Sequence, residues 1–226
     1  MYPGVLALSG LLLTLLLGLG APLERLSAER LVAEVWCELE PAVYEDQAYP
    51  VPAETAARRI LEEARVYLSA MIYGYRFSYT PYDRSRRVEE RFEITPIAEI
   101  PWGDSSLEII EVIRQGNRML GKVAYTLADH QRSRRNAWSS NTHPFSAGRG
   151  GESVLSGVSG KIAAFERSIK EAVRGYARKR VFNKPREING EVLLWEEPRV
   201  TIDSGDYVST VRIKLFIREL IPYSVF

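Results

Sequence analysis

The fold of this chain is decided by residues 107–127, Leu-Glu-Ile-Ile-Glu-Val-Ile-Arg-Gln-Gly-Asn-Arg-Met-Leu-Gly-Lys-Val-Ala-Tyr-Thr-Leu. The stretch divides into two strand-like segments around Gly116-Asn117, a pair that tolerates the positive φ of a two-residue hairpin turn. It also fits a helix, because Ser105 and Glu108 have the spacing of a capping box and the apolar residues after them can form one helical stripe. We predict the hairpin, because a similar pattern recurs later in the chain.

The second pattern lies near the C-terminus. Strand-like segments cover residues 191–195 and 199–202, and a turn at Ser204-Gly205-Asp206 precedes a longer segment at 207–217. Apolar residues alternate with polar ones in that last segment, which is typical of a half-buried strand.

Each predicted hairpin follows a predicted amphipathic helix. The first helix has an apolar stripe from Ala57 to Met71, and the second has one from Ile162 to Tyr176. Charged residues fill the opposite faces, where we expect solvent: Arg58, Arg59, Glu62, Glu63 and Arg65 on the first, and Lys161, Glu166, Arg167, Lys170, Glu171 and Arg174 on the second. After the first helix, alternating aromatic residues at 73–79 predict a strand, and residues 88–100 continue an extended pattern.

The two halves can be aligned. Ile113, Gly116 and Asn117 match Ile202, Gly205 and Asp206 at identical spacing. Glu63 and Gly116 are 53 residues apart, whereas the corresponding Glu171 and Gly205 are 34 residues apart, so the first copy would carry an insertion of 19 residues. We therefore predict an α+β fold of two helix-plus-antiparallel-hairpin units, residues 53–128 and 154–226. The units are either an internal duplication or two motifs of common residues that look alike.

The N-terminal residues predict export. The run from Val5 to Leu19 carries no charge and has the length of a signal-peptide core, and Gly18 and Gly20 offer a cleavage site before Ala21. We expect residues 1–20 to be a signal peptide and the protein to be periplasmic or in the cell envelope; the alternative is an uncleaved N-terminal anchor. Within residues 21–52 we expect a short amphipathic helix at 24–39 and a linker from Glu40 to Pro52.

Residues 129–153 between the units have no usable periodicity, so we expect a long basic loop. Arginines outnumber acids there, and aromatic side chains lie among them. The loop is our candidate partner-binding segment, through Arg132, Arg134, Arg135, Trp138, Phe145 and Arg149; the alternative is a solvated, disordered insertion. Its partner would be an envelope protein, a second copy of the chain or an anionic envelope surface.

A second candidate surface is the aromatic strand after the first helix. Tyr75, Phe77 and Tyr79 near Arg86 could stack on a glycan or a lipid headgroup. The alternative is that these rings pack in the core.

Composition excludes several classes of function. Thirty Lys and Arg against 29 Asp and Glu give a net charge of +1, which argues against nucleic-acid binding. The single Cys37 permits no intrachain disulfide framework, and we expect a buried thiol or an intermolecular disulfide. His130 and His143 lack metal-ligand spacing, and no nucleophile elbow or phosphate-binding loop is present. We therefore predict no catalytic, metal-binding or cofactor-binding residue and no multi-span membrane protein.

The chain resembles small envelope proteins of the bacterial flagellar outer-ring assembly type. The resemblance rests on an export signal, a helix containing Ala-Ala-Arg-Arg-Ile-Leu-Glu-Glu-Ala (residues 56–64) and a strand ending in Val211-Arg-Ile-Lys-Leu215. It implies a non-enzymatic role in periplasmic assembly or motility and transfers no functional residue. Together these observations predict a structural or assembly protein that acts through protein–protein contacts. The alternative is a glycan- or lipid-binding envelope module, and a hydrolase is the least favoured class.

Overall fold

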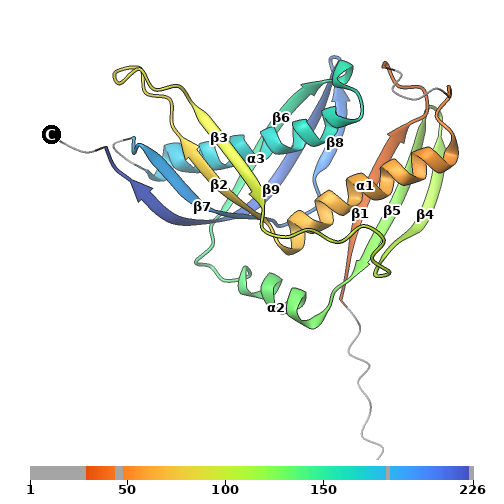
Figure 1. Cartoon of the computed structure of the whole chain (residues 1–226), viewed down its shortest axis with the longest axis horizontal. Coiled ribbons are helices and arrows are strands. Elements are labelled where there is room, and N and C mark those ends of the chain that lie inside the picture. The colour runs from red at the N-terminus through yellow and green to blue at the C-terminus, as the bar shows by residue number, and fades with distance from the viewer. Residues whose placement is uncertain (1–28, 44–47, 182–183, 224–226) are drawn as a thin grey trace, which may run out of the picture.

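The structure is a computed structural model that describes residues 29–43, 48–181 and 184–223. The predicted signal peptide and the start of the predicted 24–39 helix lie outside these residues. Across them the protein has an α+β fold in which helices cover two antiparallel sheets (Figure 1).

The first sheet, sheet A, contains three strands in the order β1-β5-β4. Its members are β1 (Arg30–Glu38), β4 (Leu107–Gln115) and β5 (Arg118–Thr126). The predicted hairpin at 107–127 is therefore confirmed, with its turn at Gly116-Asn117 and Gly116 at φ +57°.

The helix predicted at 24–39 is wrong over its described part, because residues 30–38 form strand β1. The apolar residues at four-residue spacing, such as Leu31 and Val35, suggested a helix. The buried set instead has two-residue spacing, since Ala33 and Cys37 are also buried. Pairing with β5 satisfies the backbone groups of this segment and favours the strand.

The second sheet, sheet B, has six strands in the order β3-β2-β7-β9-β6, and β8 also pairs with β9. Its members are β2 (Tyr75–Thr80), β3 (Arg91–Pro96), β6 (Phe145–Ser153), β7 (Glu187–Leu194), β8 (Arg199–Asp203) and β9 (Asp206–Ile221). The strands predicted after each helix are confirmed, although Tyr73 belongs to the end of the first helix rather than to β2.

Both predicted helices are confirmed. Helix α1 (Ala53–Ile72) packs on β1 and β5, and α3 (Ser159–Arg180) packs on β6 and β9. Their apolar faces meet in one core, where the ring of Tyr67 on α1 lies edge-on to Phe165 on α3 with centroids 5.0 Å apart.

The long loop predicted at 129–153 is wrong. Residues Asp129–Ala137 form helix α2, and Phe145–Ser153 form strand β6, which leads through a short 3-10 turn η1 (Val154–Ser156) into α3. Strand β6 escaped detection because glycines replace apolar residues on its inner face. A Cβ atom at Gly148 would lie 2.1 Å from the Ser168 carbonyl oxygen of α3.

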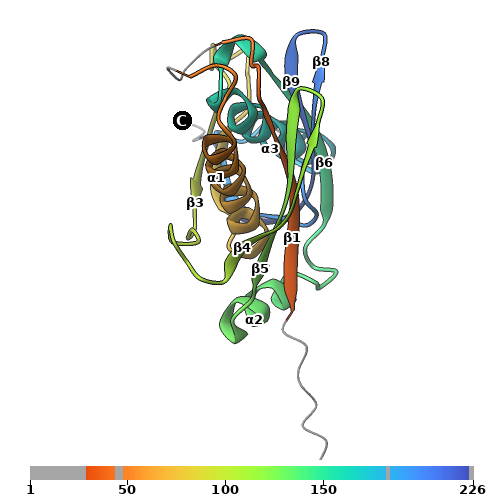
Figure 2. The ribbon, with the colours of Figure 1, turned by 90° about the vertical axis from the view of Figure 1, so that its right-hand side faces the viewer.

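Two ladders in the different sheets share one geometry. Strand β1 pairs with β5 over nine residues, from Arg30↔Thr126 to Glu38↔Arg118, and β6 pairs with β9 from Phe145↔Lys214 to Ser153↔Asp206. In each case the central strand also forms a hairpin with a two-residue turn. Both turns lie at the same end of the molecule in Figures 1 and 2.

In the described part of the chain, none of the helices has both the length and the apolar character needed to cross a bilayer.

Candidate functional site

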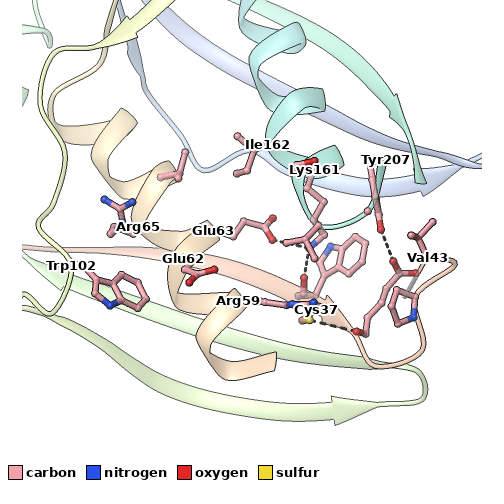
Figure 3. A pocket seen from close by; sticks show the side chains of 17 residues that line it. Cys37, Val43, Arg59, Glu62, Glu63, Arg65, Trp102, Lys161, Ile162 and Tyr207 are labelled. Atoms are coloured by element: carbon pink, nitrogen blue, oxygen red, sulfur yellow. Dashed lines mark hydrogen bonds and ion pairs between the residues drawn. The ribbon is translucent and has the colours of Figure 1, made fainter. Parts of the chain in front are cut away.

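A large hollow lies where the two units meet, and we call it the junction pocket. Its volume is about 730 Å³, within the range of small-molecule and peptide sites. The end of β1, one face of α1, the segment around Trp102 and the start of α3 line it (Figure 3).

A buried ion pair forms the polar floor of the junction pocket. The Lys161 ammonium nitrogen lies 2.8 Å from a Glu63 carboxylate oxygen, and both side chains are largely buried. The other Glu63 oxygen accepts a hydrogen bond of 2.8 Å from the Tyr67 hydroxyl. The pair joins α3 to α1, as Figure 3 shows.

Trp36 of β1 is the aromatic centre of the junction. Lys161 lies over its ring at 3.7 Å from the centroid and also donates to its carbonyl oxygen. Arg118 lies 4.2 Å from the same ring centroid, and the indole N–H donates to the Val200 carbonyl oxygen at 3.0 Å. One side chain of β1 therefore contacts α3, β5 and β8, and its contacts with Lys161 join the β1 and α3 sides of the junction pocket.

Cys37 and Tyr207 complete the end of the pocket near β1. Burial raises the pKa of the Cys37 thiol, so the neutral form dominates near pH 7, as in an inert structural cysteine. The Tyr207 hydroxyl donates to Glu38 at 2.7 Å, and this tie joins β9 to β1. The expectation of a buried thiol is confirmed.

The rim of the pocket is apolar and exposed. Trp102 is 57% exposed and Val158 is 40% exposed, and they come from different parts of the chain. Charged side chains of both signs also line the pocket, and one of them, Arg65, donates to Glu99 outside the lining at 2.9 Å. The pocket therefore offers apolar contact together with both signs of charge.

Sequence reasoning missed this site because it placed the lining charges in solvent. Lys161 was expected on the exposed face of its helix, and it is 6% exposed. Arg59, Glu62 and Glu63 were likewise expected on the solvent face of the first helix, and they line the pocket. No periodicity within one helix can report that a second unit packs against its polar face.

The basic residues proposed for partner binding are partly used inside the molecule. Arg134 donates to the Tyr73 carbonyl oxygen and Arg135 to that of Met71, so α2 caps the C-terminal end of α1. Trp138 is buried, and Arg132 pairs with Asp129 at 3.3 Å.

Two residues of that set remain on the surface. Phe145 is 45% exposed, and Arg149 forms an exposed ion pair with Asp203. The six residues therefore do not form one surface, and their role in partner binding stays a prediction.

The aromatic strand is part of the core. Tyr75, Phe77 and Tyr79 are buried, and Phe92 of β3 packs against the latter two. Arg86 is bound to Asp83 and lies over the Tyr223 ring. These rings offer no exposed face on which a sugar could stack.

No three His, Cys, Asp or Glu side chains of the described residues come together as a metal site.

Comparisons with known proteins give two matches. A protein-family model matches residues 21–223. A protein of Treponema pallidum (strain Nichols), described only as an uncharacterized protein, is 29% identical over 198 residues, which cover 85% of this chain and 81% of that protein. No solved structure matches.

Proposed function

The chain belongs to the protein family matched over residues 21–223, and from this premise we propose that it is an exported cell-envelope protein with an assembly role through protein–protein contacts. The export proposal rests on the uncharged run from Val5 to Leu19 and on the predicted cleavage site after Gly20. We propose no enzymatic activity for it. A link to flagellar outer-ring assembly stays a prediction that the matches do not address.

The observation that carries the assembly role is the exposed apolar rim of the junction pocket. Trp102 and Val158 border a hollow whose floor is held by the Lys161–Glu63 pair. Exposed tryptophans beside a preformed pocket are typical centres of binding energy in protein interfaces. A rigid floor also lowers the entropy cost of binding.

We propose that the occupant is an extended peptide segment of a partner protein, with an apolar anchor residue. The pocket lining balances three cations (Arg59, Arg65 and Lys161) against three acids (Glu38, Glu62 and Glu63). A nucleotide or another strongly charged ligand would require an excess of one sign. A peptide with an apolar anchor and mixed polar flanks fits both the apolar rim and the balanced charge.

The two units are proposed to be an internal duplication. The support is the common register of the β1–β5 and β6–β9 ladders, each with a helix after its first strand. The strand pairing makes Gln115 equivalent to Asp203, because each is the last paired residue before its turn. The sequence match of Gly116 with Gly205 instead makes Gln115 equivalent to Ser204, so the two alignments differ by one residue. Each copy also begins with a strand that the sequence patterns did not reveal.

Site-specific photo-cross-linking tests the assembly role. A photoreactive phenylalanine at Trp102 should form an adduct with one envelope protein in cells. The same residue at Val112 on β4, which is 47% exposed and outside the pocket, should form none. Mass spectrometry of the adduct identifies the partner segment, which can then be synthesised. The peptide should bind the wild-type protein at least about tenfold more tightly than Trp102→Ala, and Val112→Ala should bind like the wild type.

Equal adducts at both positions, or an identified peptide that binds Trp102→Ala as tightly as the wild type, would overturn the proposal. The photoreactive residue is also placed at Phe145. If only that position formed an adduct, the partner would bind the surface predicted from the sequence and not the junction pocket. Export is checked separately: the protein isolated from the envelope fraction should begin at Ala21, and a full-length cytosolic protein would contradict it.

A further inference from the structure

One end of the molecule, where α3 terminates, gathers three segments that are distant in the sequence. The loop between β2 and β3, the last turn of α3 and the start of β7 meet there (Figure 1). Tyr82, Arg178 and Lys184 line one hollow of about 350 Å³, and the Lys184 ammonium group donates to the Tyr82 carbonyl oxygen at 3.3 Å.

Two acids at this end, Asp83 and Glu90, are already paired with neighbouring side chains, whereas the exposed Glu89 and Glu219 form no ion pair with any described residue. Asp83 accepts from the Ser85 hydroxyl at 2.6 Å and from Arg86, and these hydrogen bonds hold the pKa of its carboxyl well below the usual range. Glu90 lies 3.1 Å from both Lys170 and Arg174. These two carboxylates therefore neutralise Arg86, Lys170 and Arg174, and they do not pair with the other cations at this end.

The remaining cations have no such partners. Six exposed side chains at this end form no ion pair with any described residue: Arg84, Arg87, Arg178, Lys179, Arg180 and Arg186. Cations in the last turn of a helix commonly complement its dipole, which accounts for the three on α3. It does not account for Arg84, Arg87 and Arg186, which lie outside the helix. The chain as a whole has a net charge of only +1, so these six side chains concentrate positive charge at one end of the molecule.

Exposed apolar groups lie among these cations. Tyr82 is 48% exposed, and Leu220, which pairs with Ile188 of the same hollow, is 47% exposed. Tyrosine and leucine beside lysine and arginine match the interface of a bilayer, where rings and short apolar chains enter the headgroup layer and cations meet phosphate.

We propose that this cationic end docks peripherally on a bilayer surface that carries anionic phosphate headgroups. The proposal goes beyond the assembly role and is independent of the junction pocket. In this arrangement the arginines and lysines at this end would contact the phosphate headgroups and hold the protein at the membrane surface. The junction pocket is lined by other residues and stays open to a partner.

Vesicle co-sedimentation of the purified mature chain tests the proposal. Vesicles with about one-third phosphatidylglycerol in phosphatidylcholine should sediment the wild-type protein at low salt, and pure phosphatidylcholine vesicles should not. The triple variant R178Q/K179Q/R180Q should bind at least about tenfold more weakly. R84Q/R87Q, which leaves the helix intact, should also weaken binding.

The matched control is R58Q/R114Q/R199Q, which removes the same charge from exposed residues elsewhere and should bind like the wild type. Equal loss in the control and the test variant would overturn the proposal, as would equal binding to neutral vesicles. Retention on immobilised polyphosphate without binding to anionic vesicles would assign the surface to a phosphate polymer and overturn the lipid proposal.

Discussion

At Lys161, a side chain expected in solvent holds the junction of the two units together. Its ammonium group contacts Glu63, the Trp36 ring and the Trp36 carbonyl oxygen, and the residue is buried. The helical stripe of α3 was predicted from the sequence, and Lys161 lies at its border. Only the packing of β1 and α1 against the start of α3 decides that this lysine is buried.

Lys161→Met should therefore destabilise the protein strongly. The substitution leaves the Glu63 carboxylate buried without its cation, which costs about 3–5 kcal/mol of unfolding free energy in such pairs. Urea unfolding measures the loss. The double variant Glu63→Gln/Lys161→Met should recover most of it, because no uncompensated charge remains.

Arg149→Gln is the matched control, because it breaks an ion pair whose partners are 63% and 55% exposed. It should change the unfolding free energy by less than about 1 kcal/mol. If Lys161→Met behaved like this control, the buried pair would not be a structural tie.

At the scale of elements, the contact between β6 and α3 shows why one strand was overlooked. The sequence Phe-Ser-Ala-Gly-Arg-Gly-Gly-Glu-Ser of β6 lacks the apolar alternation by which a half-buried strand is recognised. Its inner positions Gly148 and Gly150 lie directly on the α3 backbone. The helix thus fills the space that side chains occupy in other strands, and the periodicity disappears.

Gly148→Ala and Gly150→Ala should each destabilise the protein by about 1–3 kcal/mol or more. The added Cβ atom would lie 2.1 Å from the Ser168 carbonyl oxygen at Gly148 and 2.3 Å from the Ser168 amide nitrogen at Gly150, so α3 must shift away. Thermal unfolding followed by circular dichroism checks the effect.

Gly151→Ala provides the comparison on the same strand. Its nearest contact would be 3.8 Å, an ordinary van der Waals distance, so the melting temperature should stay close to that of the wild type. Equal melting temperatures for all three variants would show that β6 and α3 are not in close contact.

At the scale of the whole molecule, the two units share one core and one set of polar ties. Tyr67 of α1 packs on Phe165 of α3, and β1 is tied to β8 and β9 through Trp36 and Glu38. Separating the two units would therefore expose the apolar core residues of both to solvent.

We therefore expect one cooperative unfolding transition. Tryptophan fluorescence, which reports on all four tryptophans including Trp36 at the junction, and far-ultraviolet circular dichroism should give the same urea midpoint. Two separate midpoints would show that the units are independent domains.

The sequence by itself determined the elements whose patterns are local. The stripes of α1 and α3 and the alternation of β9 each follow from their own periodicity, and all appear in the structure. The turn at Gly116-Asn117 also formed, although residues 107–127 fit a helix as well and the choice of a hairpin rested on the similar pattern later in the chain. Local physics was also sufficient to separate apolar from charged faces along each helix.

Only the tertiary structure decided what those faces meet. Residues 30–38 form a strand because β5 pairs with them, and β6 forms because α3 lies on its glycines. The charged face of α1 became a pocket wall because the start of α3 lies opposite it, with Lys161 paired to Glu63. Periodicity reports which side of an element is apolar. Burial of a charged residue depends instead on a partner that is distant in the sequence.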